Sequence, residues 1–444
     1  MESPEAIAHM LAEAARAAGS DTHDVLVVGS TTTSIGVRGG ELEDVEASGG
    51  TDVGLRVLLG RKQAVVSGSD VAPDALRVLA ERAVAMARNA PDDPFAELAD
   101  PARLACDVPD LELADGRDVS PDALKERALE VEAAALDVEG VTQAEGASAS
   151  HTRSKFHLLT SHGFSGGWES TRHSLGVSAF AAREGHMERD YEHQGRRYEA
   201  DLPSPEAIGK LAGERAVRRL GARQLASGEM PVIFERRVAY SLLGAFLSAI
   251  SGTSVARGTS FLKDKMDTLV FNDRITIHDD PTVLRGLGSR PFDAEGVRCE
   301  PLRLVTDGVL EEWLLNTATA RKLGVPTTGR AHRGVGSPPG VSPTNAWIAP
   351  GKRTPQDFIN DLKTGLLVTE MFGPSLNANT GDYSVGVAGF AIEGGDVAYP
   401  VSEVTIAGNL LDIYRSLEVA DDLEFDGAVV SPTLRVAEMT VAGA

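Results

Sequence analysis

Residues 385–408 read VGVAGFAIEGGDVAYPVSEVTIAG, a run of β-branched, aromatic and small residues punctuated by Gly and Pro. Similar short β-like segments occur throughout the second half of the chain: TLVFN, RITIHD, EPLRLVTDGVLEEWLLN and TLRVAEMTVAG. Short strands at such spacing, with turn residues between them, are typical of all-β layers. The second half is therefore predicted to form a β-rich sandwich or a distorted barrel.

A long uncharged stretch precedes these segments. Residues 238–256, VAYSLLGAFLSAISGTSVA, run for 19 positions without a charge, close to the roughly 20 residues that span a bilayer. The second half of the stretch is rich in Ser, Gly and Thr, so its continuous apolar part ends near Ile250. That length suits a buried core helix, and we expect one apolar helix to enter the β-rich domain and no segment to cross a membrane.

The first half of the chain mixes helices and strands. Apolar and polar residues alternate on both sides of Gly39-Gly40, which predicts a hairpin. Helices are expected where apolar residues recur at helical spacing or where a Ser-Pro pair caps the start. They cover residues 73–89, Ser120-Pro121 to about Leu136, and Pro203 to Leu220, and residues 91–118 form a connector.

The character of the sequence changes near residues 222–230. A chain of 444 residues exceeds what one hydrophobic core usually organises, so two domains are expected. We predict an α/β N-terminal domain with hairpins and helices over residues 1–227, and the β-rich domain over residues 228–444. The fold class is then α+β.

Composition narrows the range of partners. A formal charge of -22 repels phosphate backbones and anionic membrane surfaces, so direct nucleic-acid or membrane binding is not expected. Cys106 and Cys299 are the only cysteines, and they form no disulfide framework. The N-terminus lacks the basic and apolar regions of a signal peptide. Together these features predict a cytoplasmic protein.

Residues 184–193, EGHMERDYEH, resemble a metal cluster in composition. On a helix, however, His186 and His193 would lie about 10 Å apart along the axis, and on a strand they would point to opposite faces. Neither geometry brings both to one metal ion. If Glu184-Gly185 is a hairpin turn, the residues after it form a strand. One face of that strand then carries His186, Glu188, Asp190 and Glu192, and the other Met187, Arg189, Tyr191 and His193.

Two interpretations of that strand remain open. The structural interpretation is a solvated or edge-like face of the strand. The functional one is an edge that contacts a peptide.

Motifs of hydrolytic chemistry are absent from the sequence. None of the ten histidines is followed by Glu, which excludes the His-Glu pair of HExxH-type zinc enzymes. No GxSxG nucleophile elbow occurs, and GLGSRPF and GVGSPPG fit turns better than phosphate-binding loops. No local motif therefore indicates a catalytic or metal site, although scattered His and carboxylate side chains could still assemble one in space.

Several phrases of the second half together resemble the TldD/PmbA family, also called modulators of DNA gyrase, and specifically its PmbA or TldE branch. They are AFLSAISGTSVARGTSFLKDK, GLGSRPFDAEGV, TGDYSVGVAGFAIEGGDVAYPVSEVTIAGNLLD and DLEFDGAVVSPTLRVAEMTVAG. The resemblance implies a cytosolic metalloprotease of two related subunits that degrades unfolded or extended peptides and trims peptide precursors.

The resemblance also implies how the two subunits differ. The TldD subunit carries HExxxH on a helix at the start of the C-terminal domain, and a late cysteine completes its zinc site. Anchored on Leu242-Leu243, these positions fall near Gly244, Ala245 and Ala249, and Cys299 is the last cysteine. The resemblance thus implies a metal-free TldE-like subunit with no catalytic residue, no metal ligand and no cofactor of its own, and zinc in a TldD-like partner.

Candidate peptide-binding residues follow from this resemblance. The segment Gly329–Asn345 is too rich in Gly and Pro to be a regular element, and Thr380–Ser384 reads TGDYS. Small residues let a substrate backbone approach closely. The candidates are Arg330, His332, Arg333, Thr380, Gly381, Asp382, Tyr383 and Ser384, with plain turn chemistry as the alternative.

Two other functions stay open at this point. One is a stand-alone peptide-binding modulator that forms a homodimer and has no protease activity. The other is a self-sufficient hydrolase with a site that no local motif reveals.

Overall fold

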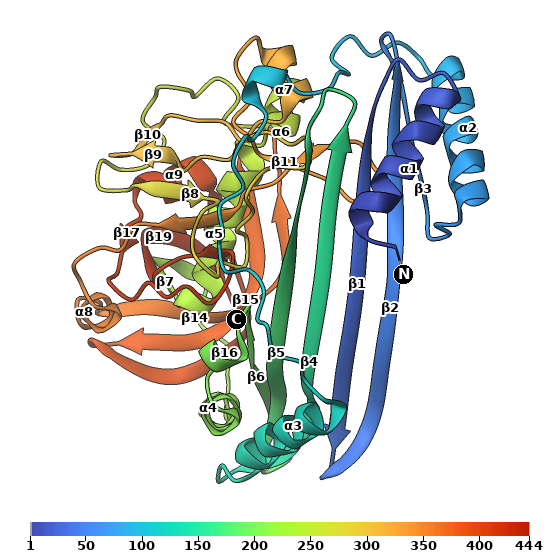
Figure 1. Cartoon of the computed structure of the whole chain (residues 1–444). Coiled ribbons are helices and arrows are strands. Elements are labelled where there is room, and N and C mark those ends of the chain that lie inside the picture. The colour runs from blue at the N-terminus through green and yellow to red at the C-terminus, as the bar shows by residue number, and fades with distance from the viewer. Residues whose placement is uncertain (1, 444) are drawn as a thin grey trace.

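Six antiparallel strands, four of them 17 to 20 residues long, form one sheet in the first half of the computed structural model, which describes residues 2–443. The order across the sheet is β3-β2-β1-β4-β5-β6. Figure 1 shows the sheet as an extended layer coloured from blue to green. The strands are β1 (Thr22–Arg38), β2 (Glu41–Leu59), β3 (Lys62–Gly68), β4 (Val141–Thr160), β5 (Ser165–Arg183) and β6 (His186–Arg196).

The predicted hairpin at Gly39-Gly40 is confirmed, with φ of +62° and +78°. The strands themselves are longer than the local patterns predict, which would make DVLVVGS, TSIGVR, VTQAEGASAS and KFHLLTS separate strands. DVLVVGS and TSIGVR form one strand, β1, and VTQAEGASAS and KFHLLTS form one strand, β4. Local patterns break at the small polar residues 29–34, but the backbone ladder continues through them, for example from Thr31 to Gly49 and Arg153.

Two helix pairs pack on the same face of this sheet, one pair at each end (Figure 1). Helices α1 (Pro4–Ala17) and α2 (Pro73–Asn89) enclose one core with Val25 and Val27 of β1. Helices α3 (Pro121–Leu136) and α4 (Pro205–Arg218) enclose another with Ile35 and Val37. All four β1 residues are odd-numbered and so point to one face. Residues 29–34 between them belong to neither core.

Serine N-caps set the starts of α3 and α4. The Ser120 side chain accepts a hydrogen bond from Ala123 N at 3.2 Å, as an N-cap serine should. The helix expected from Pro203 begins instead at Pro205, because Ser204 takes the capping position and accepts from Ala207 N at 3.1 Å.

The second half closes a five-stranded barrel, which decides between the two predicted β architectures. Its strands follow the order β16-β15-β14-β7-β19, and β19 pairs with β16 to close the ring. The opening stretch of sequence supplies β15 and β16, which turn at Gly394 and Gly395. The barrel strands are β7 (Gly228–Phe234), β14 (Thr364–Leu376), β15 (Asp382–Glu393), β16 (Asp396–Asn409) and β19 (Leu434–Ala442).

Two barrel strands and one loop differ from the sequence expectations. Strands β7 and β14 were not predicted; they pair with each other in parallel, near the centre of the sheet order. TLVFN, in contrast, is no strand and contributes only a bridge between Leu269 and Val309.

The uncharged stretch forms α5 (Arg236–Ala249) followed by α6 (Gly252–Arg257). Helix α5 buries Leu242, Leu243 and Phe246 in the main core of the second half, which confirms the core-helix prediction. Among residues 2–443, no helix is both long and apolar enough to cross a membrane.

Short elements surround the barrel. A smaller sheet has the order β10-β9-β8-β13-β18, β11 pairs with β12, and β17 pairs with β19. Their bounds are β8 (Ile277–Asp280), β9 (Leu302–Thr306), β10 (Val309–Leu310), α7 (Thr317–Leu323), β11 (Ala331–His332), β12 (Gly340–Val341), β13 (Asn345–Ile348), α8 (Pro355–Asn360), α9 (Leu410–Arg415), β17 (Glu418–Val419) and β18 (Val429–Val430).

Candidate functional site

The EGHMERDYEH segment forms the turn and the outer strand of the long sheet. Glu184 and Gly185 have φ of +53° and +83° and make the predicted hairpin turn. Strand β6 follows and pairs with β5 along its whole length. Among the described strands β6 has no second neighbour, so its other edge is free.

The part of the acidic face of β6 that carries Asp190 and Glu192 is buried, which corrects the interpretation of a solvated face there, whereas His186 is exposed and Glu188 is half-buried. The edge-like alternative fits, because β6 is the outer strand of the sheet. Asp190 is 2% exposed and Glu192 is 9% exposed. Asp190 accepts hydrogen bonds from both terminal nitrogens of Arg237, at 2.6 and 2.8 Å, and Glu192 accepts one from Arg215. Helices α4 and α5 bring these arginines to the strand, so each buried carboxylate has a partner.

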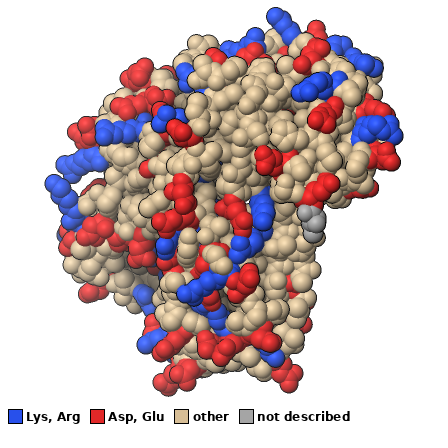
Figure 2. All heavy atoms as spheres, viewed as in Figure 1, with Lys and Arg blue, Asp and Glu red and all other residues tan. Residues whose placement is uncertain are grey.

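Further ion pairs join the sheet to the barrel. Arg219, from the end of α4, donates a hydrogen bond to Glu370 of β14 and lies 3.5 Å from Glu188. Arg189 donates to the other oxygen of Glu370 at 3.1 Å. Figure 2 shows acidic and basic side chains interspersed over the lower part of the molecule, where α3 and α4 lie in Figure 1.

Burial and ion pairing shift the carboxylate pKa values of this network in opposite directions. Burial alone would raise the pKa of Asp190, but the hydrogen bonds and charge of Arg237 outweigh it and leave that pKa lowered. For Glu188 burial prevails over Arg219, and its pKa is raised. Asp190 is therefore a fixed negative charge between the two halves.

A pocket of about 270 Å³ opens along the free edge of β6. Residues 191–194 of β6 form one wall, the start of α5 forms another, and residues 426–431 complete it. Tyr191 and Tyr240, 43% and 49% exposed, lie on two of these walls. We call this pocket the β6 groove.

The charges in the β6 groove are already paired. Arg236 lies 2.8 Å from Glu424 and 3.0 Å from Asp426, and the guanidinium of Arg237 is 5.9 Å from the centre of the Tyr191 ring. What remains available is exposed aromatic surface beside an unpaired strand edge. Such an edge can take an extended peptide by strand addition.

Three positions on α5 are those that the resemblance compares with zinc ligands. A side chain at Gly244 would meet nothing within 4 Å, Ala245 packs partly against the core, and Ala249 is 6% exposed. None carries a group that can bind zinc. Among residues 2–443 there is no group of three or more His, Cys, Asp or Glu side chains that could hold a metal ion.

Cys299 offers no replacement ligand. Its thiol is buried and donates a hydrogen bond to Gly329 O at 3.2 Å. Burial, with Asp293 nearby, raises the pKa of this thiol to about 12. A thiolate, the form that binds metals, is therefore strongly disfavoured there. The residues present do not fit a zinc site.

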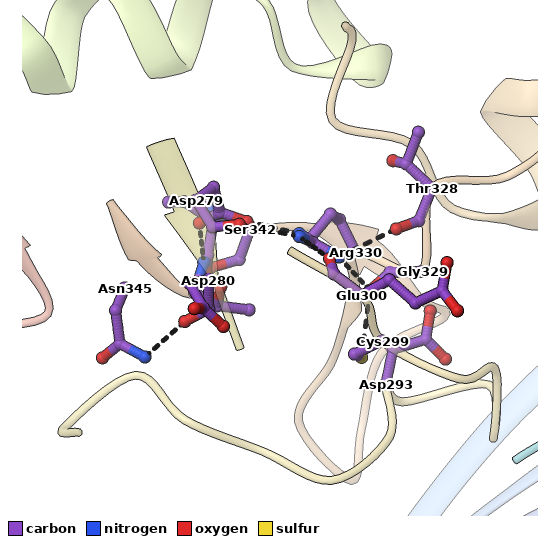
Figure 3. Close-up of polar contacts among 12 residues, drawn as sticks. Asp279, Asp280, Asp293, Cys299, Glu300, Thr328, Gly329, Arg330, Ser342 and Asn345 are labelled. Carbon is purple, nitrogen blue, oxygen red and sulfur yellow. Dashed lines mark hydrogen bonds and ion pairs between the residues drawn. The ribbon is translucent and has the colours of Figure 1, made fainter. Parts of the chain in front are cut away.

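Arg330, a candidate for peptide contact, is enclosed by protein instead. Its side chain is 0% exposed and ion-paired with Asp279. Its terminal nitrogens donate to Thr328 O and Glu300 O, at 2.8 and 2.7 Å, and Figure 3 shows these contacts converging on the guanidinium. The Arg330 side chain is therefore not available to a peptide.

Arg333 is also engaged inside the protein. It lies 2.5 Å from Asp24 of β1, which Arg56 of β2 contacts from the other side at 2.6 Å. The loop tip beyond it lies on β2 so closely that a side-chain carbon at Gly54 would be 2.1 Å from Val335 O. We call residues 329–341 the clasp, because they fasten the second half to the long sheet. His332 alone of the three candidates there is exposed.

The candidates at residues 380–384 form a turn and the start of β15. Asp382 accepts hydrogen bonds from Thr380 Oγ1 at 2.6 Å and from Asn409 Nδ2 at 3.1 Å, and Gly381 has φ of +83°. Tyr383 is buried in the core, and Ser384 is half-buried on β15. Turn chemistry accounts for this segment, and the residues found along the β6 groove include none of the eight candidates.

Comparison with known proteins gives the family. Residues 23–87, 114–220 and 227–443 match the first, central and C-terminal domains of the PmbA/TldA metallopeptidases. The chain is 39% identical to "Metalloprotease PmbA" of Escherichia coli O157:H7 over 96% of its own length and 93% of the relative's. The chain belongs to the PmbA/TldD family. A "Metalloprotease PmbA homolog" of Haemophilus influenzae is 36% identical over 97% and 94% of the two chains.

Solved structures of PmbA/TldD relatives share the fold. A protein from Bacteroides thetaiotaomicron described as a modulator of DNA gyrase superposes with a TM-score of 0.91 at 27% identity, covering 99% of this chain and 98% of the other. TldE from Thermococcus kodakarensis superposes with a TM-score of 0.87 at 21% identity, covering 98% and 100%. At that identity the second comparison shows the fold alone. At the level of the family, the role is that of a metalloprotease.

Proposed function

We propose that this chain is the metal-free, TldE-like subunit of a heteromeric metalloprotease, whose zinc is held by a TldD-like partner. The observation that supports this most is the set of side chains on α5. The helix is formed, but Gly244, Ala245 and Ala249 stand at the positions compared with the zinc ligands and the general base. Such a chain can bind substrate and complete an assembly without hydrolysing a peptide bond itself.

We further propose that unfolded or extended peptides, including peptide precursors, lie along the β6 groove. Tyr191 N already donates to Asp190 Oδ1 at 2.8 Å, but no strand pairs with this edge of β6 among the described residues. The remaining backbone donors and acceptors of such an edge bind a peptide main chain with little regard to its sequence. Tyr191 and Tyr240 add exposed aromatic area, and aromatic residues often contribute most to binding at such surfaces.

Co-purification tests the assembly. Tagged chain is expressed with the TldD-like protein of the same organism, and hydrolysis of an unfolded peptide is compared for each protein alone and for both. We expect a stable complex, with zinc bound to the partner and activity only when both are present. A partner that never co-purifies and cleaves equally well alone refutes the proposal.

A groove variant tests the substrate site within that assembly. Tyr240→Ala should raise the KM of the complex by roughly fivefold to tenfold, because truncating an aromatic contact residue typically costs 1 kcal/mol or more. Met86→Ala on α2, at a side chain that is 49% exposed, is the matched control and should leave KM unchanged. Equal effects of the two substitutions would remove the β6 groove from substrate binding.

Two measurements address the competing functions. If the isolated chain forms a homodimer and binds unfolded peptide while no TldD-like protein joins it, the stand-alone modulator replaces our proposal. If the purified chain contains stoichiometric zinc and shows chelator-sensitive peptidase activity alone, it is a self-sufficient hydrolase.

A further inference from the structure

The largest of the described cavities lies away from the β6 groove, against the connector. It has a volume of about 1,210 Å³, whereas small-molecule pockets usually measure about 300–1,000 Å³. Residues 100–109 form one wall, and the rest is formed by residues 266–267, 282, 291, 297–302, 311–315 and 325–328. We call this cavity the connector groove. Its size suits a segment of a polymer better than a metabolite.

The connector wall is held in place by the backbone. Ala105 N donates to Gly296 O at 2.9 Å, and Arg298 N donates to Arg103 O at 3.1 Å. The Arg103 side chain also donates to Thr327 O across the groove, at 3.3 Å. The groove is therefore a built feature of the fold.

Apolar side chains form part of the groove surface. Trp313 and Leu315 reach it from the main core, where they are 8% and 2% exposed. Met266 and Leu302 are half-buried beside them, and Val325 is 45% exposed on the rim. An extended segment with apolar side chains would bury this surface.

Carboxylates predominate among the charged groups of the groove. The groove has two arginines, Arg103 and Arg298, and six carboxylates. The carboxylates are Asp100, Asp107, Asp267, Glu300, Glu311 and Glu312. The β6 groove has the opposite balance, with three arginines and two carboxylates. The excess of carboxylates in the connector groove is thus local and does not follow only from the net negative charge of the chain.

Glu312 is the carboxylate whose surroundings indicate a ligand. Arg298 lies 3.4 Å from Glu300, and Glu311 accepts a hydrogen bond from Thr306 Oγ1 at 2.8 Å. Glu312, in contrast, is half-buried and has neither a hydrogen bond nor an ion pair with any described residue. Burial raises its pKa, and the nearby charges of Glu311 and Asp267 add to that. A cationic side chain would relieve both effects.

We propose that the connector groove binds an extended peptide segment in which Lys or Arg residues are interspersed with apolar ones. The basic side chains pair with Glu312 and its acidic neighbours, and the apolar ones cover Met266 and Val325. Within the proposed protease the groove would select substrates by composition, a role that rests on the proposed function. This binding is a property of the single chain and does not depend on the proposed partner.

Fluorescence anisotropy with three dye-labelled nine-residue peptides tests the proposal on the purified full chain. The peptides are three repeats of Lys-Leu-Ser, Glu-Leu-Ser and Lys-Ser-Ser. We expect clear saturable binding of the first, weakened by added salt, and at least tenfold weaker binding of the other two. Equal affinity for all three would overturn the proposal, because neither charge nor apolar content would then matter.

Substitutions locate the binding. Glu300→Gln, Glu311→Gln and Glu312→Gln together should weaken it roughly tenfold, since each partly screened ion pair contributes a few-fold. Val325→Ser, on the exposed rim, should weaken it a few-fold without removing charge. The matched control, Glu13→Gln, Glu41→Gln and Glu46→Gln, removes the same charge from exposed positions of α1 and β2 and should change affinity less than twofold. If control and groove variants lose affinity equally, the attraction is non-specific and the groove is not the site.

Discussion

Replacing Asp190 with Asn would test the ion-pair network that joins the sheet to the barrel. The amide keeps the shape and one acceptor but removes the charge that Arg237 contacts at 2.6 and 2.8 Å, and that lies 3.7 Å from Arg219. Leaving a buried charge without its partner typically costs about 3–5 kcal/mol. Glu235 lies 3.3 Å from Arg237 and Glu370 contacts Arg219, so we expect the lower end, about 3 kcal/mol.

Urea unfolding, followed by far-UV circular dichroism and tryptophan fluorescence, measures this loss. The control is Glu81→Gln, which removes the exposed pair between Arg77 and Glu81 on α2 and should cost at most about 0.5 kcal/mol. Because Asp190 and Arg237 lie on different halves of the molecule, Asp190→Asn should also separate the unfolding of the two halves. A loss equal to that of Glu81→Gln would refute the reasoning.

The pH dependence gives a second check on Asp190. Its folded pKa is lowered from the ordinary value of 3.8, so the charge stabilises the fold above that value and the contribution is lost as the pH falls through the folded pKa. The difference in stability between Asp190→Asn and the unaltered chain should therefore be full at pH 7 and shrink in acid below about pH 4. A difference that grows in acid would contradict this sign.

Three further outcomes follow from other sites. Gly54→Ala should push the clasp off β2 and cost about 1–3 kcal/mol, whereas Gly50→Ala, with nothing within 4 Å, should cost far less; urea unfolding of both variants measures this. Burial and Asp293 raise the pKa of Glu295 to about 7, so the free energy of unfolding should fall as the pH rises from about 4.5 to 7. Glu295→Gln should flatten that fall and stabilise the chain at pH 8 by up to about 3 kcal/mol. A thiol reagent at pH 8 should label Cys106, which is exposed, and spare buried Cys299, giving one label per native chain and two after denaturation, by mass spectrometry.

Local sequence patterns predicted the elements that local chemistry determines. Gly39-Gly40 and Glu184-Gly185 located two hairpin turns, and Ser120 located the start of α3. The end of the apolar run near Ile250 located the end of α5. The strand of EGHMERDYEH was also predicted with the correct alternation of faces.

Partners that lie far apart along the chain could not be predicted in this way. Asp190 and Arg237 are 47 positions apart, and Arg189 and Glu370 are 181 apart, so no local pattern relates them. The acidic face of β6 therefore read as solvated, although the basic last turn of α4, including Arg219, was visible in the sequence. Likewise Arg330 and Arg333 read as peptide contacts, because their partners Asp279 and Asp24 lie in other elements.

The parallel pair β7 and β14 was missed for a related reason. A strand surrounded by other strands needs no simple alternation, and the burial pattern of β14 over residues 365–370 is nearly continuous. Without that pair, the sequence could not distinguish a closed barrel from a sandwich.

The separation of the two helix-covered cores along the long sheet has a consequence for local stability. Strand β1 joins them through residues 29–34, GSTTTS, which are half-buried or exposed and belong to neither core. Along that stretch the ladder to β2 and β4 holds the sheet together with little apolar burial. Amide hydrogen exchange should therefore divide one continuous strand into three parts, with slow exchange at both ends and faster exchange between them. A single polypeptide strand would then take part in two cooperative unfolding units.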